Sequence, residues 1–190
     1  YTNYMYENLT AGIDETATGT LAGPIIIGFC ILGYNTITLP LKDSKALNSE
    51  AKRQETAKAI REQALWCCTK QVEHYTTYST VIRTMCAQIE AMYPGITLII
   101  DGDKHFNIPR LNAVVKADAT HPTVSAASII AKVYHDDYMN SINTRVDFGF
   151  KNHKGYGTPE HIKALNQYGP IRGVHRENID KVKKALKSKG

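Results

Sequence analysis

Apolar positions change their spacing along the chain, and each change marks a predicted element. The run PIIIGFCILG at 24–33 is almost continuously apolar and rich in Ile, which favours a buried strand. Residues 9–16 form a shorter extended segment, and the small residues between the two runs predict an antiparallel hairpin. Residues 65–73 and 96–100 are further predicted strands.

Helical spacing replaces this pattern in three other segments. Residues 48–64 begin at a capping residue, Asn48 or Ser49, and continue with good helix formers. Residues 77–93 end at a Pro-Gly pair, and residues 121–143 form a long apolar helix with a proline near its first position. Helices that alternate with strands behind a hairpin predict an α/β fold, with a mixed central β-sheet flanked by helices.

The long helix carries two kinds of position that bear on packing. Its small residues Ala126, Ala127 and Ala131 should let it pack closely on the sheet. Its polar residues recur at three- and four-residue steps, so they form one stripe, which we interpret as the solvent edge of the helix. The members of this stripe are Ser125, Ser128, Lys132 and His135.

Composition narrows the class of protein. The chain has 190 residues, 43% of them hydrophobic and 22% charged, which suits a single domain over 1–190, with a C-terminal helical segment (about 158–190) packing on it. No apolar run has the length of a membrane helix, and no signal peptide is recognisable, so we expect a monomeric cytoplasmic protein with no membrane partner. A net charge of +5 permits a polyanionic partner without requiring one.

The cysteines do not form a metal or redox motif. None of them makes a C-x-x-C pair, so we expect free thiols, as in a reducing compartment. Adjacent cysteines on a strand point to opposite faces, which also prevents them from ligating one metal. The residues are Cys30, Cys67, Cys68 and Cys86.

Acidic residues follow several of the predicted strands. Asp14 and Glu15 end the first strand, Asp101 follows 96–100, and Asp118 ends a short apolar run at 112–118. Because strand ends at one edge of an α/β sheet converge, these acids can meet there. Clustered carboxylates need a cation, and all-oxygen ligands select Mg²⁺ or Mn²⁺ over zinc.

Two reservations apply to this set of acids. Neighbouring residues on a strand face opposite ways, so Asp14 and Glu15 cannot both face one site unless the chain bends, and we rank Asp14 as the better ligand. Asp103, Asp136 and Asp137 are the acids that could substitute for members of the set.

Seven motifs follow one another along the chain: GIDE (12–15), G-x-x-x-GP (19–24), KDSK (42–45), IIDGD (99–103), VVKADATHPTVSAASIIAKV (114–133), HKGYGTPEH (153–161) and YGPIRGVHR (168–176). In this order they resemble the type 2 ribonucleases H, and ribonuclease HII most closely. The resemblance extends from about residue 11 to 178, and its longer motifs are far more specific than a short pattern.

This resemblance implies a ribonuclease H-like fold and a function. It implies that two divalent ions, Mg²⁺ or Mn²⁺, promote hydrolysis of the RNA strand of RNA/DNA hybrids, or of ribonucleotide-containing DNA, leaving 5′-phosphate and 3′-hydroxyl ends. The implied catalytic and metal-binding residues are Asp14, Glu15, Asp101 and Asp118. The implied nucleic-acid contacts are Ala17, Thr18, Gly19, Ser44, Lys45, Lys154, Tyr156 and Arg176, whereas His153 and His175 stay outside the catalytic set.

The chain departs from the family pattern just after the first acids. Ribonuclease HII usually has Gly-Arg-Gly where this chain has Ala17-Thr18-Gly19, so an arginine cation is lost and a Cβ is added. A Thr at this position resembles ribonuclease HIII, which prefers longer RNA tracts. We therefore expect incision at a single ribonucleotide to be weaker than cleavage within RNA tracts.

Two other functions stay open. The first is a hybrid-binding module that keeps the fold but has weak catalysis, although carboxylates facing a phosphate backbone would oppose binding without metal. The second is a nuclease that does not distinguish the 2′-hydroxyl. An all-DNA duplex separates this nuclease from a ribonuclease.

Overall fold

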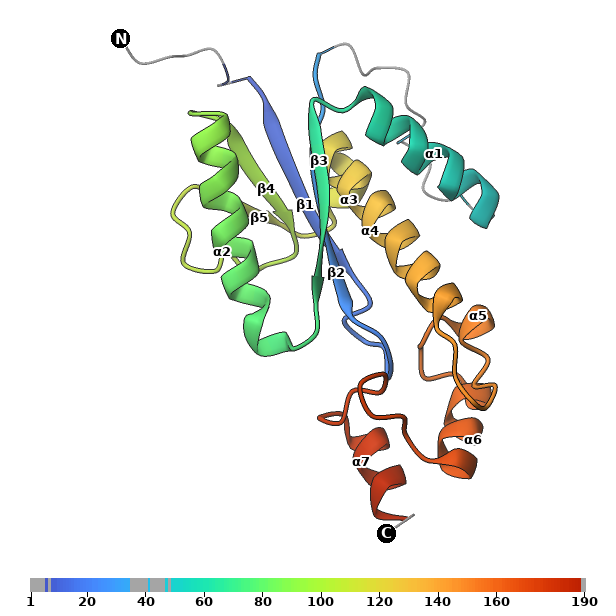
Figure 1. The fold of residues 1–190 in the computed structure, drawn as a ribbon. Helices are drawn as coiled ribbons and strands as arrows, with labels where there is room; N and C mark the ends of the chain where they lie inside the picture. Colours follow the sequence, from blue (N-terminus) through green and yellow to red (C-terminus); the bar gives the residue numbers. More distant parts are fainter. Residues whose placement is uncertain (1–5, 7, 35–40, 42–46, 48, 189–190) are drawn as a thin grey trace.

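A five-stranded mixed sheet forms the centre of the molecule (Figure 1). The computed structural model describes residues 6, 8–34, 41, 47 and 49–188. The strands lie in the order β3-β2-β1-β4-β5, in which β1 is antiparallel to β2 and parallel to β4. Their bounds are β1 Thr10–Thr16, β2 Ile25–Ile31, β3 Trp66–Val72, β4 Thr97–Asp101 and β5 Leu111–Val114.

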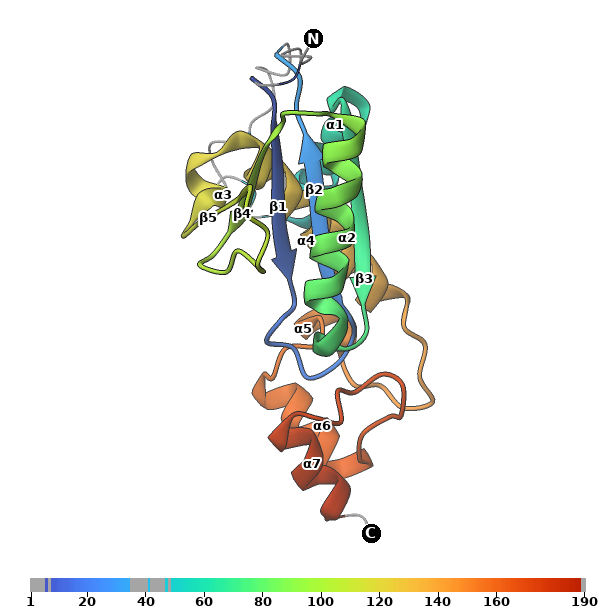
Figure 2. The ribbon, with the colours of Figure 1, turned by 90° about the vertical axis from the view of Figure 1, so that its left-hand side faces the viewer.

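Helices cover both faces of this sheet. Figure 2 shows α2 on one face and α4 on the other, with α1 beside α4. The bounds are α1 Glu50–Gln63, α2 Tyr75–Met92, α3 Ala117–Thr120, α4 Pro122–Ser141, α5 Phe150–His153, α6 Pro159–Tyr168 and α7 Asp180–Lys187. The predicted fold class and hairpin are confirmed. Ser49 caps α1 by accepting a hydrogen bond from the Lys52 amide, whereas Asn48 lies outside the described residues.

The apolar side chains divide into separate cores on the two faces of the sheet. One core joins the sheet to α2, and another joins it to α1 and α4. Cys68 packs against the first core and Cys67 against the second, as strand alternation predicts. All four cysteines are free thiols, which confirms that prediction.

Helix α4 lies directly against β1 and β2 because glycines occupy the contact. A Cβ built on Gly12 would lie 2.2 Å from the Thr123 carbonyl carbon, and one on Gly28 would lie 2.1 Å from the Ala127 oxygen. At these distances neither glycine could be replaced by a residue with a side chain, and their absence of a Cβ lets the backbones of α4 and the two strands approach closely. The predicted close packing of the small residues in α4 is confirmed, since Ala126, Ala127 and Ala131 are fully buried.

The polar stripe of α4 is not the solvent edge of the helix, so that interpretation is wrong. Ser125 and His135 are buried, and Ser128 and Lys132 are partly buried. The stripe is covered because the close contact with β1 and β2 buries this side of α4. Ser125 donates to the Leu41 carbonyl, and Ser128 donates to Asp14.

The C-terminal helices α6 and α7 lie at one end of the molecule (Figures 1 and 2). They follow the end of the sheet at which the turn between β1 and β2 lies. Leu21, from that turn, packs in a small core with Leu165 of α6 and Val182 of α7. The turn therefore connects the sheet to the C-terminal segment. Among the described residues, no helix has the length and apolar character needed to cross a membrane.

Candidate active site

The two acids at the end of β1 point to opposite faces of the sheet. The Asp14 carboxylate accepts a hydrogen bond from Ser128 on α4, and the Glu15 carboxylate accepts one from Tyr78 on α2. Asp101 ends the neighbouring parallel strand β4 and interacts electrostatically with both acids. The two side chains thus face opposite sides of the sheet, as expected from the alternation along a strand. The Asp101 carboxylate on the adjacent strand is nevertheless close enough to interact with both.

Asp14 is buried, with only 6% of its surface exposed. Burial, reinforced by the charges of Glu15 and Asp101 and partly opposed by the Ser128 hydroxyl, raises its pKa to about 7. The Glu15 amide also donates to the Asp14 Oδ1 at 2.8 Å. An uncompensated carboxylate in such a place costs folding free energy and suits a bound cation.

Glu15 is less deeply buried, and its partner is an aromatic hydroxyl. Burial raises the pKa of Glu15, the Tyr78 hydrogen bond opposes the shift, and the Asp101 charge reinforces it. Tyr78 is itself 5% exposed, and burial together with the Glu15 charge raises its pKa. Tyr78 therefore keeps its proton and remains a donor to Glu15.

Asp118 is reached differently from the way the sequence suggested. It does not end a strand, because β5 stops at Val114 and the chain turns through Lys116, whose φ is 58°, into the short helix α3. The amide of its neighbour Ala117 donates to the Asp101 Oδ1 at 2.6 Å, which holds the start of α3 beside the end of β4.

The acids predicted to bind metal are not arranged as a metal centre in this structure. Within the described part of the chain, no three His, Cys, Asp or Glu side chains are arranged as a metal site. The electrostatic contacts join Asp14, Glu15 and Asp101, and the Ala117 hydrogen bond holds the start of α3 beside Asp101. None of these contacts includes the Asp118 carboxylate. The four-carboxylate assignment stays a prediction.

The acids that could have substituted for this set have other surroundings. Asp136 is 2.8 Å from the Lys132 Nζ. Burial acts to raise the pKa of Asp136, but hydrogen bonds from His135 and Lys132 outweigh it and lower the pKa. Asp137 accepts a hydrogen bond from Gln54 at 2.6 Å. Asp103 lines the same cleft as Glu15 and Asp101 but is exposed.

The residues that replace Gly-Arg-Gly form a tight turn held by Arg176. Ala17 has a φ of 69°, in the left-handed region that disfavours a side chain, and it is buried. The Arg176 guanidinium donates to the carbonyls of Ala17 at 2.7 Å, Thr18 at 3.1 Å and Gly23 at 2.8 Å. Arg176 was expected to contact nucleic acid, but here its guanidinium fixes the backbone of the turn.

The same turn joins motifs that are far apart in the sequence. The Leu21 amide donates to the Gly155 carbonyl at 2.8 Å, and the Gly23 amide donates to the Val174 carbonyl at 2.9 Å. A Cβ on Gly155, whose φ is 85°, would lie 2.5 Å from the Ala22 oxygen. The HKGYGT and GVHR segments therefore meet on the turn that follows Asp14 and Glu15.

The Tyr156 ring lies beside Lys132, which is one helical turn along α4 from Ser128, the serine that binds Asp14. The Lys132 Nζ is 5.6 Å from the centroid of the Tyr156 ring, and the ring is 37% exposed. Residues four apart share one face of a helix, so Ser128 and Lys132 place Tyr156 close to the acids. The sequence predicted that Tyr156 contacts nucleic acid, and a partly exposed ring at this place is compatible with that prediction.

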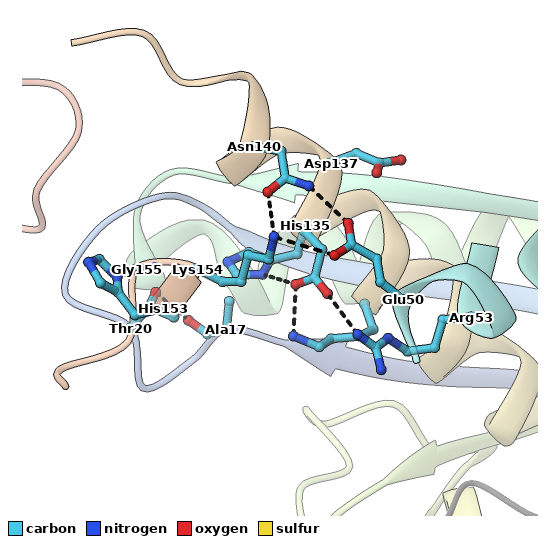
Figure 3. Close-up of polar contacts among 12 residues, drawn as sticks. Ala17, Thr20, Glu50, Arg53, His135, Asp137, Asn140, His153, Lys154 and Gly155 are labelled. Carbon is cyan, nitrogen blue, oxygen red and sulfur yellow. Dashed lines mark hydrogen bonds and ion pairs between the residues drawn. The ribbon is translucent and has the colours of Figure 1, made fainter. Parts of the chain in front are cut away.

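Lys154 is placed less favourably for nucleic-acid contact. Figure 3 shows its ammonium between Asn140 of α4 and Glu50 of α1; it donates to the Asn140 Oδ1 and lies 3.8 Å from the Glu50 Oε2. Its side chain is 13% exposed, so much of its charge is compensated within the protein. Ser44 and Lys45 lie outside the described residues.

Three histidines form a buried cluster next to the Tyr156 loop. The Ile171 amide donates to the His175 Nδ1 at 2.9 Å, so the His175 Nε2 carries the proton and donates to the His161 Nε2 at 3.1 Å. The His161 Nδ1 then donates to the Tyr156 carbonyl at 2.9 Å. Burial lowers the pKa of His175 to about 4 and also lowers that of His161. His153, stacked on His161, donates to the Phe148 carbonyl at 2.6 Å, so these rings support the loop.

Sequence reasoning did not assign a site role to three side chains that lie beside the acids: Ser128, Tyr78 and Lys104. For Ser128 a signal existed, because a polar stripe on an otherwise buried helix must face other polar groups. For Tyr78 and Lys104 no pattern was available, since their proximity to Glu15 depends on how α2 and the β4–β5 loop pack.

A cleft opens in front of Glu15 and Asp101. Its volume is about 270 Å³, and its walls come from the end of β1, the start of α2 and the β4–β5 loop. Acids from two strands meet there, and aromatic rings face them. The arrangement can hold a cation on one side and a polar, planar ligand on the other.

Comparisons with known proteins give the family. A sequence model of ribonuclease HII matches residues 67–183. The ribonuclease HII of Neisseria gonorrhoeae is 39% identical, with 94% of this chain and 95% of that protein covered, and that of Pelagibacter ubique is 32% identical, with 94% and 99% covered.

Solved structures agree on the fold. The ribonuclease H2 of Pyrococcus horikoshii superposes with a TM-score of 0.72 at 21% identity, covering 95% of this chain and 98% of that one. Bst-RNase HIII, solved in complex with Mn²⁺, gives 0.72 at 21% identity, covering 98% and 72%. The fold is therefore ribonuclease H-like, and on the sequence matches this chain belongs to the ribonuclease HII family of hydrolytic nucleases.

Proposed function

We propose that the protein is an endoribonuclease that hydrolyses the RNA strand of RNA/DNA hybrids and leaves 5′-phosphate and 3′-hydroxyl ends. The observation that carries this proposal is the meeting of Asp14, Glu15 and Asp101 at one end of the sheet, in a chain of the ribonuclease HII family. Catalysis would use Asp14, Glu15, Asp101 and Asp118.

The acids have the donor chemistry of a divalent-ion site. Their donors are all oxygen, which suits Mg²⁺ or Mn²⁺, and burial and mutual repulsion raise the pKa values of Asp14 and Glu15, which a bound cation would reverse. Two such ions, when bound, would supply an activated water and stabilise the leaving 3′ oxygen. A structure of a related chain, Bst-RNase HIII, holds Mn²⁺.

The other residues of the site orient these groups and the substrate. Ser128 and Tyr78 fix the directions of the Asp14 and Glu15 carboxylates. Arg176 holds the turn, so that its backbone can approach the RNA strand, and the Tyr156 ring is free to pack on a sugar or base. No side-chain nucleophile is required.

A cleavage series tests the activity. A hybrid with a long RNA tract should be cut in the presence of Mg²⁺ or Mn²⁺ and left intact with a chelator, and an all-DNA duplex should not be cut. A protein that binds the hybrid equally with and without metal and never cuts it would be a binding module. Cleavage of the all-DNA duplex would identify a nuclease that ignores the 2′-hydroxyl.

We further propose that incision at a single ribonucleotide is weaker than cleavage in a tract, because Thr18 supplies no cation where ribonuclease HII usually has Arg. Duplexes with one, four and many ribonucleotides should be cut with increasing kcat/KM. The variant Ala17→Gly/Thr18→Arg should raise cleavage at one ribonucleotide more than cleavage in the tract. Equal or better cutting of the single-ribonucleotide duplex by the unmodified protein would contradict the proposal.

A further inference from the structure

A tyrosine and a lysine stand at the mouth of the cleft without a role in the site described so far. Tyr75 is the first residue of α2 and is 54% exposed. Its ring stacks on Tyr78 with centroids 5.6 Å apart and planes 9° apart. Tyr78 in turn packs on Phe106 at 5.5 Å. The Tyr75 ring is thus supported from within the protein while remaining open to solvent.

Lys104 completes this rim from the β4–β5 loop. Its Nζ donates to the Tyr75 hydroxyl at 3.2 Å and lies 5.9 Å from the ring centroid. The side chain is exposed, and among the ion pairs of the described residues none includes Lys104. Asp103 and Glu15 attract this ammonium without forming an ion pair with it. A cation fixed beside an exposed ring is a suitable partner for a phosphate.

Both residues line the same cleft as the acids. Tyr75 and Lys104 share its wall with Glu15, Thr18 and Asp101. At about 270 Å³ the cleft suits a ligand fragment of roughly the size of one nucleotide. A polyanion that places a phosphate at Glu15 and Asp101 therefore has this rim within reach.

We propose that Tyr75 and Lys104 form a nucleic-acid-binding subsite, in which the Tyr75 ring stacks on a base or sugar and Lys104 binds the phosphate of a nucleotide next to the one hydrolysed. This subsite rests on the proposed function, since its ligand is the same nucleic acid. Tyr78 links it to catalysis, because the ring on which Tyr75 stacks also holds Glu15.

Binding measurements separate the two contributions. In an Asp14→Asn background, which should not cleave, the Kd for a hybrid is measured by fluorescence anisotropy over a range of salt concentrations. Tyr75→Ala should weaken binding about 5- to 100-fold with little change in salt dependence, as loss of a stacking contact does. Lys104→Ala should reduce the slope of log K against log salt by about 1, as loss of one phosphate contact does.

Matched variants control for folding and for net charge. Tyr75→Phe keeps the ring and loses its hydroxyl, so it should bind within about 3-fold of the parent. Lys58→Ala removes an equally positive but distant side chain, which is 77% exposed on α1, and should leave the salt slope unchanged. Melting temperatures show whether any variant is unfolded.

The outcomes distinguish this subsite from the proposed function. If the unmodified protein neither binds nor cuts the hybrid, the proposed function itself fails. If it does both, but Tyr75→Ala binds like Tyr75→Phe and Lys104→Ala behaves like Lys58→Ala, the subsite is disproved. A loss in Tyr75→Ala that requires Mg²⁺ would also overturn it, because the ring would then act only through Tyr78 and the acids.

Discussion

The acids at the end of β1 and the histidines of α5, α6 and the segment before α7 are both buried polar clusters, but their polar atoms are satisfied differently. In the histidine cluster each bond between His175, His161 and the Tyr156 carbonyl pairs one donor with one acceptor. In the acid cluster Asp14, Glu15 and Asp101 repel one another, and Ser128 and Tyr78 offset only part of the cost.

This difference separates a structural role from a functional one. A neutral, fully hydrogen-bonded cluster stabilises the fold and needs no ligand. A buried cluster of like charges destabilises the folded state by itself. Such clusters are typical of functional sites, where a bound cation or ligand offsets the repulsion. The comparison therefore predicts opposite responses to mutation and to pH.

The largest expected effect comes from Asp14→Asn. Cleavage of the hybrid should fall by about 10³-fold or more, because the proposed function makes Asp14 a ligand of the metal. The metal-free variant should nevertheless be more stable than the parent at pH 8, by about 1–2 kcal/mol, since it no longer buries an ionised carboxylate. Single-turnover rates and chemical denaturation measure the two quantities.

The pH dependence supplies the check on this prediction. The folded pKa of Asp14, about 7, is above its ordinary 3.8, so the free energy of unfolding of the parent falls as pH rises from its ordinary pKa through 7. Asp14→Asn lacks this carboxylate, so its stability relative to the parent increases over the same range. Asp103→Asn, in the same cleft but exposed, is the matched control and should change neither quantity by much. A destabilised Asp14→Asn protein at pH 8 would contradict the account of Asp14.

The histidine cluster should respond in the reverse sense. His161→Ala should reduce the free energy of unfolding by about 2–4 kcal/mol, because it opens a cavity and leaves the His175 Nε2–H and the Tyr156 carbonyl without partners. At temperatures where the variant is folded, its kcat should stay within about 3-fold of the parent. His105→Ala, at an exposed position, should cost less than about 0.5 kcal/mol.

Acid should weaken the same cluster in the unmodified protein. The folded pKa of His175 is about 4 and its ordinary value is 6.5, so its contribution is complete above 6.5 and is lost as pH falls toward 4. We expect a loss on the order of 2 kcal/mol between pH 7 and pH 4.5 from this group. Urea denaturation at both pH values, with His161→Ala as reference, measures it; an equal loss in that variant would assign the effect elsewhere.

The smallest effect concerns the turn that connects the two clusters. Ala17→Gly should raise the free energy of unfolding by about 0.5–1 kcal/mol, because glycine adopts a φ of 69° without the strain of a Cβ. Gly19→Ala is the control: a Cβ there would meet nothing within 4 Å, so its effect should be small. If both substitutions change stability equally, backbone strain at Ala17 is not the cause.

Much of the fold followed from local pattern. The continuous apolar run at 24–33 predicted the buried strand β2, and the three- and four-residue spacing predicted α1, α2 and α4 within a few residues. These elements could be predicted because burial on a sheet or along a helix imposes a period on the sequence. Asp118 was misplaced because the turn at Lys116 ends β5 early, and a left-handed non-glycine residue leaves no pattern.

By itself, the sequence determined most of the strands and helices and the family, and it indicated which acids we propose for the site, since these depend on local spacing and on motifs. Only the tertiary structure decided that Ser128 of α4 binds Asp14, that Tyr78 binds Glu15, and that Arg176 holds a turn rather than standing free. The physical reason is that such contacts join residues up to 159 positions apart, and their partners are chosen by how close two surfaces pack. Gly12 and Gly28 show this most directly, because the absence of two side chains brings α4 against the sheet and Ser128 to Asp14.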